Sequence, residues 1–74
     1  MPRLEQEFFT PLVAVLTMRR MALGISQAEL NFRIGCPDNH LAKWEAGMHR
    51  PSIYFLLLWC EALGYRLQLK EIFE

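Results

Sequence analysis

The sequence predicts an all-α fold, a compact bundle of four to five helices, with one short β-strand at the C-terminal end. Residues that favour helix starts and stops bracket four segments, at 10–24, 26–35, 37–46 and 52–63. Residues 65–70 instead alternate between apolar and polar side chains, which is the period of a strand. Because 74 residues support only one small core, we expect a lead-in (1–9), one helical domain (10–64) and a tail (65–74).

The composition points to a partner for this domain. Apolar residues make up 53% of the chain, which is more than one small core can bury. The net charge is zero, which by itself argues mildly against nucleic acid as the partner. The basic residues, however, gather in the middle of the chain, so that the middle could present a basic face. They are Arg19, Arg20, Arg33, Lys43, His49 and Arg50.

Several classes of protein are excluded by what the sequence lacks. No apolar run reaches the roughly 18 residues that cross a bilayer, and no signal peptide is recognisable. Two cysteines, Cys36 and Cys60, do not form a disulfide framework or a metal-ligand cluster, which favours the reduced cytoplasm. No catalytic arrangement of nucleophile, base or paired carboxylates is evident. We therefore expect no enzyme activity, no metal and no cofactor.

The first helix should begin at Thr10, since Pro11 is well tolerated at the first helical position, and Gly24 should end it. Its apolar stripe consists of Leu12, Leu16 and Leu23. Residues 1–9 have no clear cap, and they contain apolar side chains that could dock on the domain. These are Leu4, Phe8 and Phe9.

The second helix has the clearest start. Ser26 can cap it, and Glu29, three residues later, completes the pattern of a capping box. Ile25 and Leu30 can form a hydrophobic staple across this cap. The helix is short, because Gly35 supplies a tight turn with positive φ.

The third helix is predicted to begin at Pro37 and to end before Gly47. Only Leu41 and Trp44 are large and apolar, so that one narrow side is buried. Such a polar helix is weak by itself and must be held by packing. A helix held in this way with its polar side outward is suited to recognising a partner.

The fourth helix is predicted from Ser52, its cap, to about Leu63, with Gly64 closing it. In the segment that follows, Tyr65, Leu67 and Leu69 fall on one side of a strand. A single strand needs a partner, and no other segment of the chain offers one. The same strand of a second copy is the expected partner.

Two short helices joined by a glycine turn describe a helix-turn-helix, here from about Ser26 to Trp44. Residues 12 to 64 resemble the Xre or lambda-repressor-like helix-turn-helix domains. The resemblance rests on Arg20, Gly24-Ile25-Ser26-Gln27-Ala28-Glu29-Leu30, Gly35, Trp44-Glu45, Gly47 and Pro51-Ser52. It implies a DNA-binding transcriptional regulator of a bacterium or phage, acting in the cytoplasm.

The resemblance also assigns roles by position. In such domains an arginine at the end of the first helix pairs with a glutamate after the recognition helix, and Arg20 and Glu45 occupy these places. The alternative is that Arg20 and Glu45 are two surface charges that do not contact each other. The residues expected to contact the DNA backbone are Ser26, Gln27, His49 and Arg50. Those expected to read bases are Pro37, Asp38, Asn39, His40 and Lys43.

The chemistry of these base-reading residues differs. Asn39 can bond bidentately with adenine, and Lys43 can reach guanine acceptors or a phosphate. His40 can contact a base or a phosphate, or be merely exposed. Asp38 is repelled by phosphates, so it would accept a hydrogen bond from cytosine or orient Lys43. Pro37 departs from the family, in which serine or threonine commonly caps this helix.

The fourth helix differs from the family in its apolar character. Tyr54, Phe55 and Leu58 fall where relatives have polar residues, whereas the family's core side consists of Ile53, Leu56, Trp59, Cys60 and Leu63. The surplus indicates either a dimer interface or an unusually apolar core. A two-fold dimer would combine this helix with a two-stranded ribbon, and the tail resembles that of antitoxins of the HipB type.

Three functions remain open from the sequence. The first is a sequence-specific regulator that binds a near-palindromic site as a homodimer, with recognition helices about 34 Å apart. The second is an antitoxin that binds both its operator and a toxin. The third is a protein-interaction module that keeps the fold without binding DNA.

Overall fold

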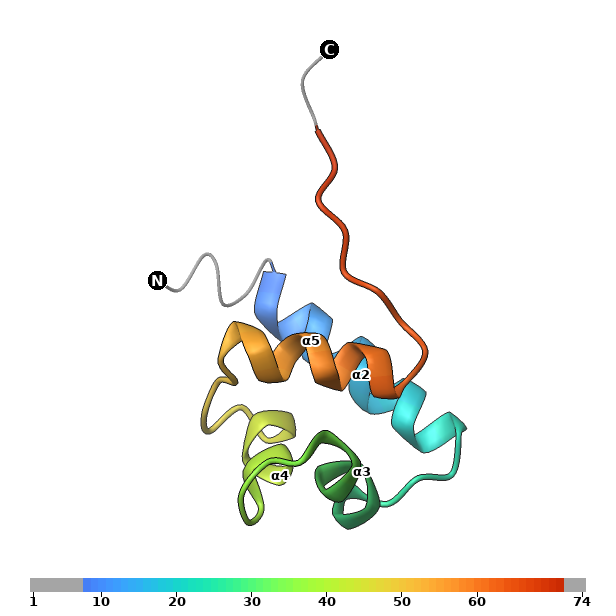
Figure 1. Ribbon diagram of the computed structural model, residues 1–74, viewed down its shortest axis with the longest axis vertical. Helices are drawn as coiled ribbons and strands as arrows, with labels where there is room; N and C mark the ends of the chain where they lie inside the picture. The colour runs from blue at the N-terminus through green and yellow to red at the C-terminus, as the bar shows by residue number, and fades with distance from the viewer. Residues whose placement is uncertain (1–7, 72–74) are drawn as a thin grey trace.

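The computed structural model describes residues 8–71, and over that range the chain forms four helices. Their bounds are α2 (Thr10–Ala22), α3 (Gln27–Ile34), α4 (His40–Glu45) and α5 (Ile53–Ala62). Helix α3 packs against α4 and α5, and α2 packs against α4. Helices α3 and α4 lie together at one end of the molecule, and the C-terminal segment leaves from the other end (Figure 1). None of these helices is long and apolar enough to cross a membrane.

The helix ends follow the local signals of the sequence. Helix α2 starts at Thr10 with proline in its first turn, and the Ser26 hydroxyl caps α3 by accepting the Glu29 N–H at 3.0 Å. The second hydrogen bond of the predicted capping box, from the Ser26 N–H to the Glu29 side chain, is not formed. The Glu29 carboxylate instead accepts from Arg33 Nε at 2.8 Å. Ser52 caps α5, as predicted. Gly35 ends α3 with φ +78°, a left-handed conformation that glycine adopts without strain.

The core lies where the four helices meet. Its centre is a pair of tryptophans, Trp44 of α4 and Trp59 of α5, whose ring centroids are 5.5 Å apart. The buried apolar residues are Val13, Leu16, Leu30, Ile34, Leu41, Trp44, Trp59, Cys60 and Leu63. Leu23, predicted in the stripe of the first helix, is 45% exposed, because α2 ends one residue before it. Leu4 lies outside the described residues, Phe8 is exposed, and Phe9 packs on the core.

The core side predicted for α5 is confirmed at Trp59, Cys60 and Leu63, but the side that faces the core is wider than predicted. Ile53, expected in the core, is the first residue of the helix and is 70% exposed, whereas Phe55 and Leu58, expected at an interface, are half-buried and pack on the core. Phe55 lies one turn before Trp59, and its ring packs at a tilt on Trp44 with ring centroids 5.9 Å apart. The outward side of α5 therefore carries Ile53, Tyr54 and Leu57.

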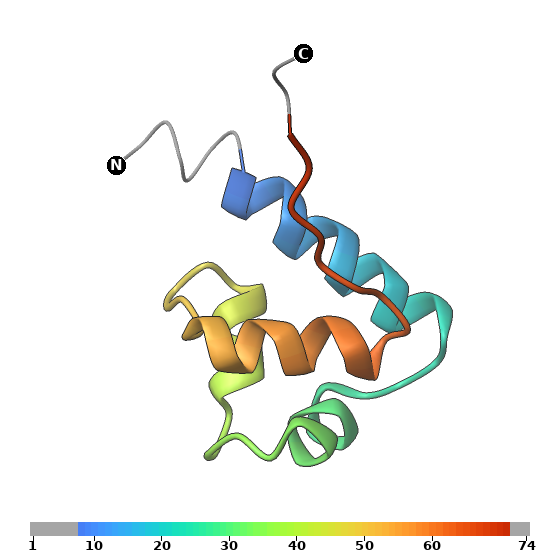
Figure 2. The ribbon, with the colours of Figure 1, turned by 45° about the horizontal axis from the view of Figure 1, so that its top comes forward.

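Residues 65–71 have no regular secondary structure in this single chain. They run away from the end of α5, past the N-terminal end of α2 (Figures 1 and 2). Arg19 holds their start, because its Nε donates to the Leu63 carbonyl at 3.0 Å and its guanidinium lies 5.5 Å from the centre of the Tyr65 ring. Beyond this point Leu69 is fully exposed. The described residues therefore contain no strand, and the predicted pairing with a second copy remains a prediction.

Candidate nucleic-acid interface

Residues 35–39 form the turn between α3 and α4, and they show where the predicted third helix is wrong. That helix was expected to begin at Pro37, but α4 begins at His40. Asn39, which directly precedes it, has φ +58°, a left-handed conformation that does not continue an α-helix. Residues 37–39 therefore belong to the turn, and only two turns of helix remain for recognition.

The start of α4 has no local cap, and Asn31 of α3 replaces one. Its Oδ1 accepts the Leu41 N–H at 3.0 Å, and its Nδ2 donates to the carbonyls of Cys36 at 3.1 Å and Pro37 at 3.2 Å. The Cys36 thiol donates to the same Oδ1 at 3.0 Å, and burial raises the pKa of this thiol, which keeps the proton on sulfur. One side chain thus bonds to the turn and to the Leu41 N–H in the first turn of α4.

Sequence reasoning did not find this role for Asn31. The one available signal was an asparagine in the middle of a short helix, where it lowers helix stability unless its side chain has other partners. The structure supplies those partners from the turn, and they are not visible in the local pattern.

Arg20 and Glu45, expected to pair, lie together and fix the other end of α4. Arg20 Nε donates to Glu45 Oε2 at 2.8 Å, and Nη2 donates to Oε1 at 3.1 Å, which is a bidentate ion pair. Nη1 also donates to the Ile25 carbonyl at 2.7 Å. The exposed fractions of the two side chains are only 11% and 5%. The pair therefore ties α4 to α2 and to the segment that precedes α3.

Gln27 joins this cluster. Its Nε2 donates to Glu45 Oε1 at 2.7 Å, so that one of its two amide hydrogens is already used within the protein. The other amide hydrogen is still available, and the side chain is exposed at the start of α3. Ser26 beside it is also exposed, with its hydroxyl oxygen engaged as the cap of α3.

The residues expected to read bases separate onto two sides of α4. Asp38 and Asn39 are exposed, and they line a polar hollow between the starts of α3 and α4, together with Gln27, Ala28, Asn31 and Ala42. His40 and Lys43 are half-buried and line a second hollow, together with Trp44, His49 and Arg50. We call these the polar hollow and the cationic hollow. Pro37 is exposed but lines neither of them.

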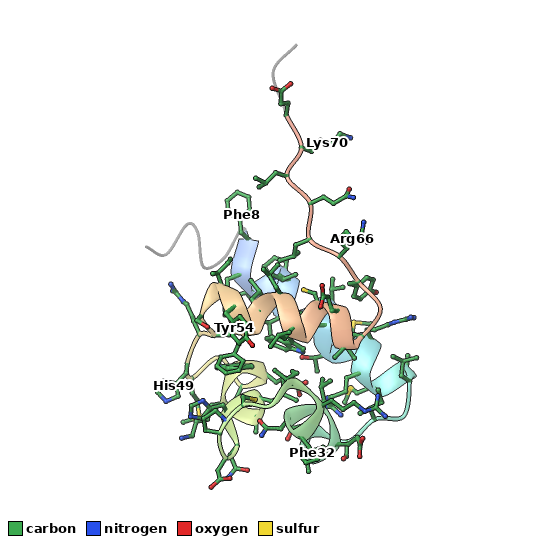
Figure 3. All side chains as sticks on the ribbon, viewed as in Figure 1. Phe8, Phe32, His49, Tyr54, Arg66 and Lys70 are labelled. Atoms are coloured by element: carbon green, nitrogen blue, oxygen red, sulfur yellow. The ribbon has the colours of Figure 1, made fainter. Side chains whose placement is uncertain are left out.

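The loop after α4 builds the second side of the cationic hollow. The Lys43 carbonyl accepts the N–H groups of Met48 at 2.9 Å and His49 at 3.4 Å, which folds the loop back onto α4. Gly47 allows this reversal with φ +78°. Figure 3 shows His49 on the outer side of this loop. The Arg50 guanidinium lies 5.7 Å from the centre of the Phe9 ring.

Between residues 8 and 71 no cluster of three or more histidine, cysteine or acidic side chains could hold a metal ion. The two histidines lie beside Lys43 and Arg50 instead, a setting that attracts anions and repels cations.

Comparison with protein families gives one match, a family model described as helix-turn-helix, which covers residues 16–70. The matched range contains all of α3, α4 and α5 and the second half of α2. Comparisons with curated proteins and with solved structures give no match.

Proposed function

Because the chain belongs to the Xre/lambda-repressor-like helix-turn-helix family, we propose that it is a sequence-specific transcriptional regulator that binds DNA as a homodimer. The supporting observation is the way in which α4 is held. Its start is bonded to Asn31 and its end to Arg20, while its outward side carries polar and basic residues. A short helix fixed at both ends enters the major groove without a further loss of conformational entropy. We place this activity in the cytoplasm, where the DNA of a bacterium or phage is found.

In this proposal Asn39 and Asp38 contact base edges from the polar hollow. The carboxamide of Asn39 bonds with N6 and N7 of adenine, and the Asp38 carboxylate accepts from N4 of cytosine. Ser26 and Gln27 approach the backbone with the start of α3, where unpaired N–H groups favour a phosphate. His49 and Arg50 contact the backbone from the loop after α4.

Selection of bound duplexes from a random DNA pool tests this function, followed by binding measurements on the selected duplex and on a scrambled duplex. Asn39→Gly, which removes the carboxamide but tolerates the left-handed backbone at φ +58°, should reduce the preference for the selected duplex by roughly 5- to 150-fold, the value of one bidentate base contact. Met21→Ala, at an exposed position of α2 that lines neither hollow, is the control and should leave the preference unchanged. A wild-type chain that shows no preference among duplexes would contradict the proposal.

The homodimer is supported by apolar side chains that the single chain leaves exposed. Ile53, Tyr54 and Leu57 are 70%, 64% and 43% exposed on α5, and Leu67 and Leu69 are exposed on the tail. Tyr54 lies on the outer side of α5 (Figure 3). In the proposed dimer the α5 helices pack together and residues 65–69 pair as an antiparallel ribbon, which gives the unpaired backbone its hydrogen bonds. The interface predicted from the sequence consists of Tyr54, Phe55, Leu58, Tyr65, Leu67 and Leu69. The dimer proposed here adds Ile53 and Leu57 to it and leaves out Phe55 and Leu58.

Light scattering tests the homodimer directly. The wild-type chain should show twice the mass of one chain at micromolar concentration, and Leu57→Glu should show the mass of a monomer. Met21→Glu, at an exposed apolar position on α2, is the matched control and should stay dimeric. A monomeric wild-type chain would contradict the homodimer, and a dimer that survives Leu57→Glu would place the interface elsewhere.

A second candidate function is an antitoxin, and Phe32 favours it. This side chain is 82% exposed on α3, at the end of the molecule opposite the tail (Figure 3). A dimer formed through α5 and the tail leaves Phe32 uncovered, so this side chain stays accessible to a different protein. Co-purification of a toxin from a neighbouring gene, lost in Phe32→Ser, would support this function.

Absence of DNA binding even at low salt would favour the third candidate, an interaction module that does not bind DNA.

A further inference from the structure

Another hollow lies between α2 and the end of α4, and we call it the apolar hollow. We propose that it binds a small uncharged molecule with two fused aromatic rings and one hydrogen-bonding group. Its volume is about 400 Å³, whereas a cavity of about 150 Å³ holds one benzene ring. Of the residues that line it, only Trp44 also lines the cationic hollow, so the site is distinct from those of the proposed function.

The walls of the apolar hollow suit a flat apolar ligand. One wall is the side of α2 that carries Val13, Ala14 and Met18, with Phe9 directly before the helix. The other wall consists of residues 44–47, at the end of α4 and in the turn after it. Phe9 is half-buried and Met18 is 70% exposed, so both can contact a ligand. Aromatic rings stack favourably on one another, and the flexible methionine side chain adapts to the ring that it covers.

The charge of the apolar hollow favours an uncharged ligand. Among the described residues that line it, Glu45 is the only charged one, and its carboxylate is already paired with Arg20. The Glu45 side chain is 5% exposed, so that little of its charge reaches a ligand. A charged molecule would lose its hydration in this site without gaining a partner of opposite charge.

Thr17 adds a hydrogen-bonding group to the wall formed by α2. Its Oγ1 is buried without a hydrogen-bond partner among the described residues, which lowers the stability of the fold. This atom is closed to water, so a ligand that bonds to it does not compete with solvent. A hydroxyl or carbonyl on the ligand meets this need, because a threonine hydroxyl both donates and accepts.

The position of the apolar hollow links ligand binding to the way in which α4 is held. The Arg20–Glu45 pair ties the end of α4 to α2, and the hollow lies between the same two elements. A ligand that contacts both walls adds contacts between α2 and α4. It binds the folded chain and not the unfolded one, so we expect it to raise the thermal midpoint.

Isothermal titration calorimetry with β-naphthol tests the site. The wild-type chain should bind one molecule per chain, and its thermal midpoint in circular dichroism should rise. β-Naphthoate, which has the same rings and a negative charge, should not bind. Ala14→Phe should abolish binding of β-naphthol, because the larger side chain fills the hollow. Val15→Phe, at the next position of α2, which is exposed but does not line the hollow, is the matched control and should bind as the wild type does.

Thr17→Val tests the hydrogen bond separately, since valine keeps the shape of threonine. It should weaken binding of β-naphthol roughly 2- to 10-fold, the value of one neutral hydrogen bond, although the variant itself should be more stable. Unchanged binding by Thr17→Val overturns the hydrogen bond. No binding of β-naphthol, equal binding by Ala14→Phe, or equally tight binding of β-naphthoate overturns the site. None of these measurements involves DNA, so that their failure leaves the proposed function standing.

Discussion

Replacing Arg20 should destabilise the fold far more than replacing Arg33, although both make an ion pair at 2.8 Å. The exposed fractions are 11% and 5% for Arg20 and Glu45, against 48% and 51% for Arg33 and Glu29. Removing one partner of a buried pair leaves an uncompensated charge, at a cost of about 3–5 kcal/mol. An exposed pair within one helix contributes only about 0.3–0.5 kcal/mol.

The size of the domain makes the first loss severe. A domain of this length has an unfolding free energy of about 4–11 kcal/mol, so Arg20→Ala should remove about a quarter of it or more. Arg20→Lys keeps the charge but not the bidentate geometry, and its loss should be intermediate. Arg33→Ala should lie within about 0.5 kcal/mol of the wild type.

Urea denaturation followed by tryptophan fluorescence measures these differences, since Trp44 and Trp59 are both buried in the core. All variants are compared at one protein concentration, because dimerisation contributes to apparent stability. A loss below about 1 kcal/mol for Arg20→Ala, or equal losses for Arg20→Ala and Arg33→Ala, would refute the role of burial in this pair.

Two further predictions concern single side chains. Asn31→Ala should lower the unfolding free energy by about 1–3 kcal/mol, since it leaves the Leu41 N–H without its acceptor, and Asn31→Asp should lose at least as much in the same urea titration, because a carboxylate oxygen would replace the amide that donates to the carbonyls of Cys36 and Pro37. Thr17→Val should raise the thermal midpoint, because the Thr17 hydroxyl is buried without a hydrogen-bond partner among the described residues and valine has nearly the same shape; a lower midpoint would contradict this.

Local signals in the sequence were enough to find the helices. Ser26 and Ser52 cap the helices that they were predicted to cap, and Gly35 and Gly64 adopt the positive φ expected of them. These signals work because a cap hydrogen bond joins residues three positions apart and depends on little else. The pattern of short helices around a glycine turn was therefore sufficient to predict a small helical domain with a helix-turn-helix.

The features that the sequence did not predict depend on contacts between distant residues. The start of α4 is set by Asn31, ten residues before Leu41, whose N–H it accepts. The burial of Phe55 on α5 is set by its contact with Trp44. Neither contact can be read from the local sequence pattern, so the start of α4 and the burial of Phe55 were predicted wrongly.

The candidate site was predicted as one set of base-reading residues, and the structure separates it into two. Asp38 and Asn39 lie in the turn before α4, whereas His40 and Lys43 lie on α4, so the two pairs line different hollows although they are close in sequence. Which side meets the loop at residues 48–50 depends on the reversal at Gly47. The separation of Asp38 from Lys43 was therefore visible only in three dimensions.

The most direct test of the central claim is the selection of duplexes from a random pool by the wild-type chain. The account predicts that the bound duplexes share one near-palindromic sequence, and that affinity for it falls steeply as salt rises. Recovery of unrelated sequences, or binding that does not respond to salt, would contradict the claim that α4 reads DNA.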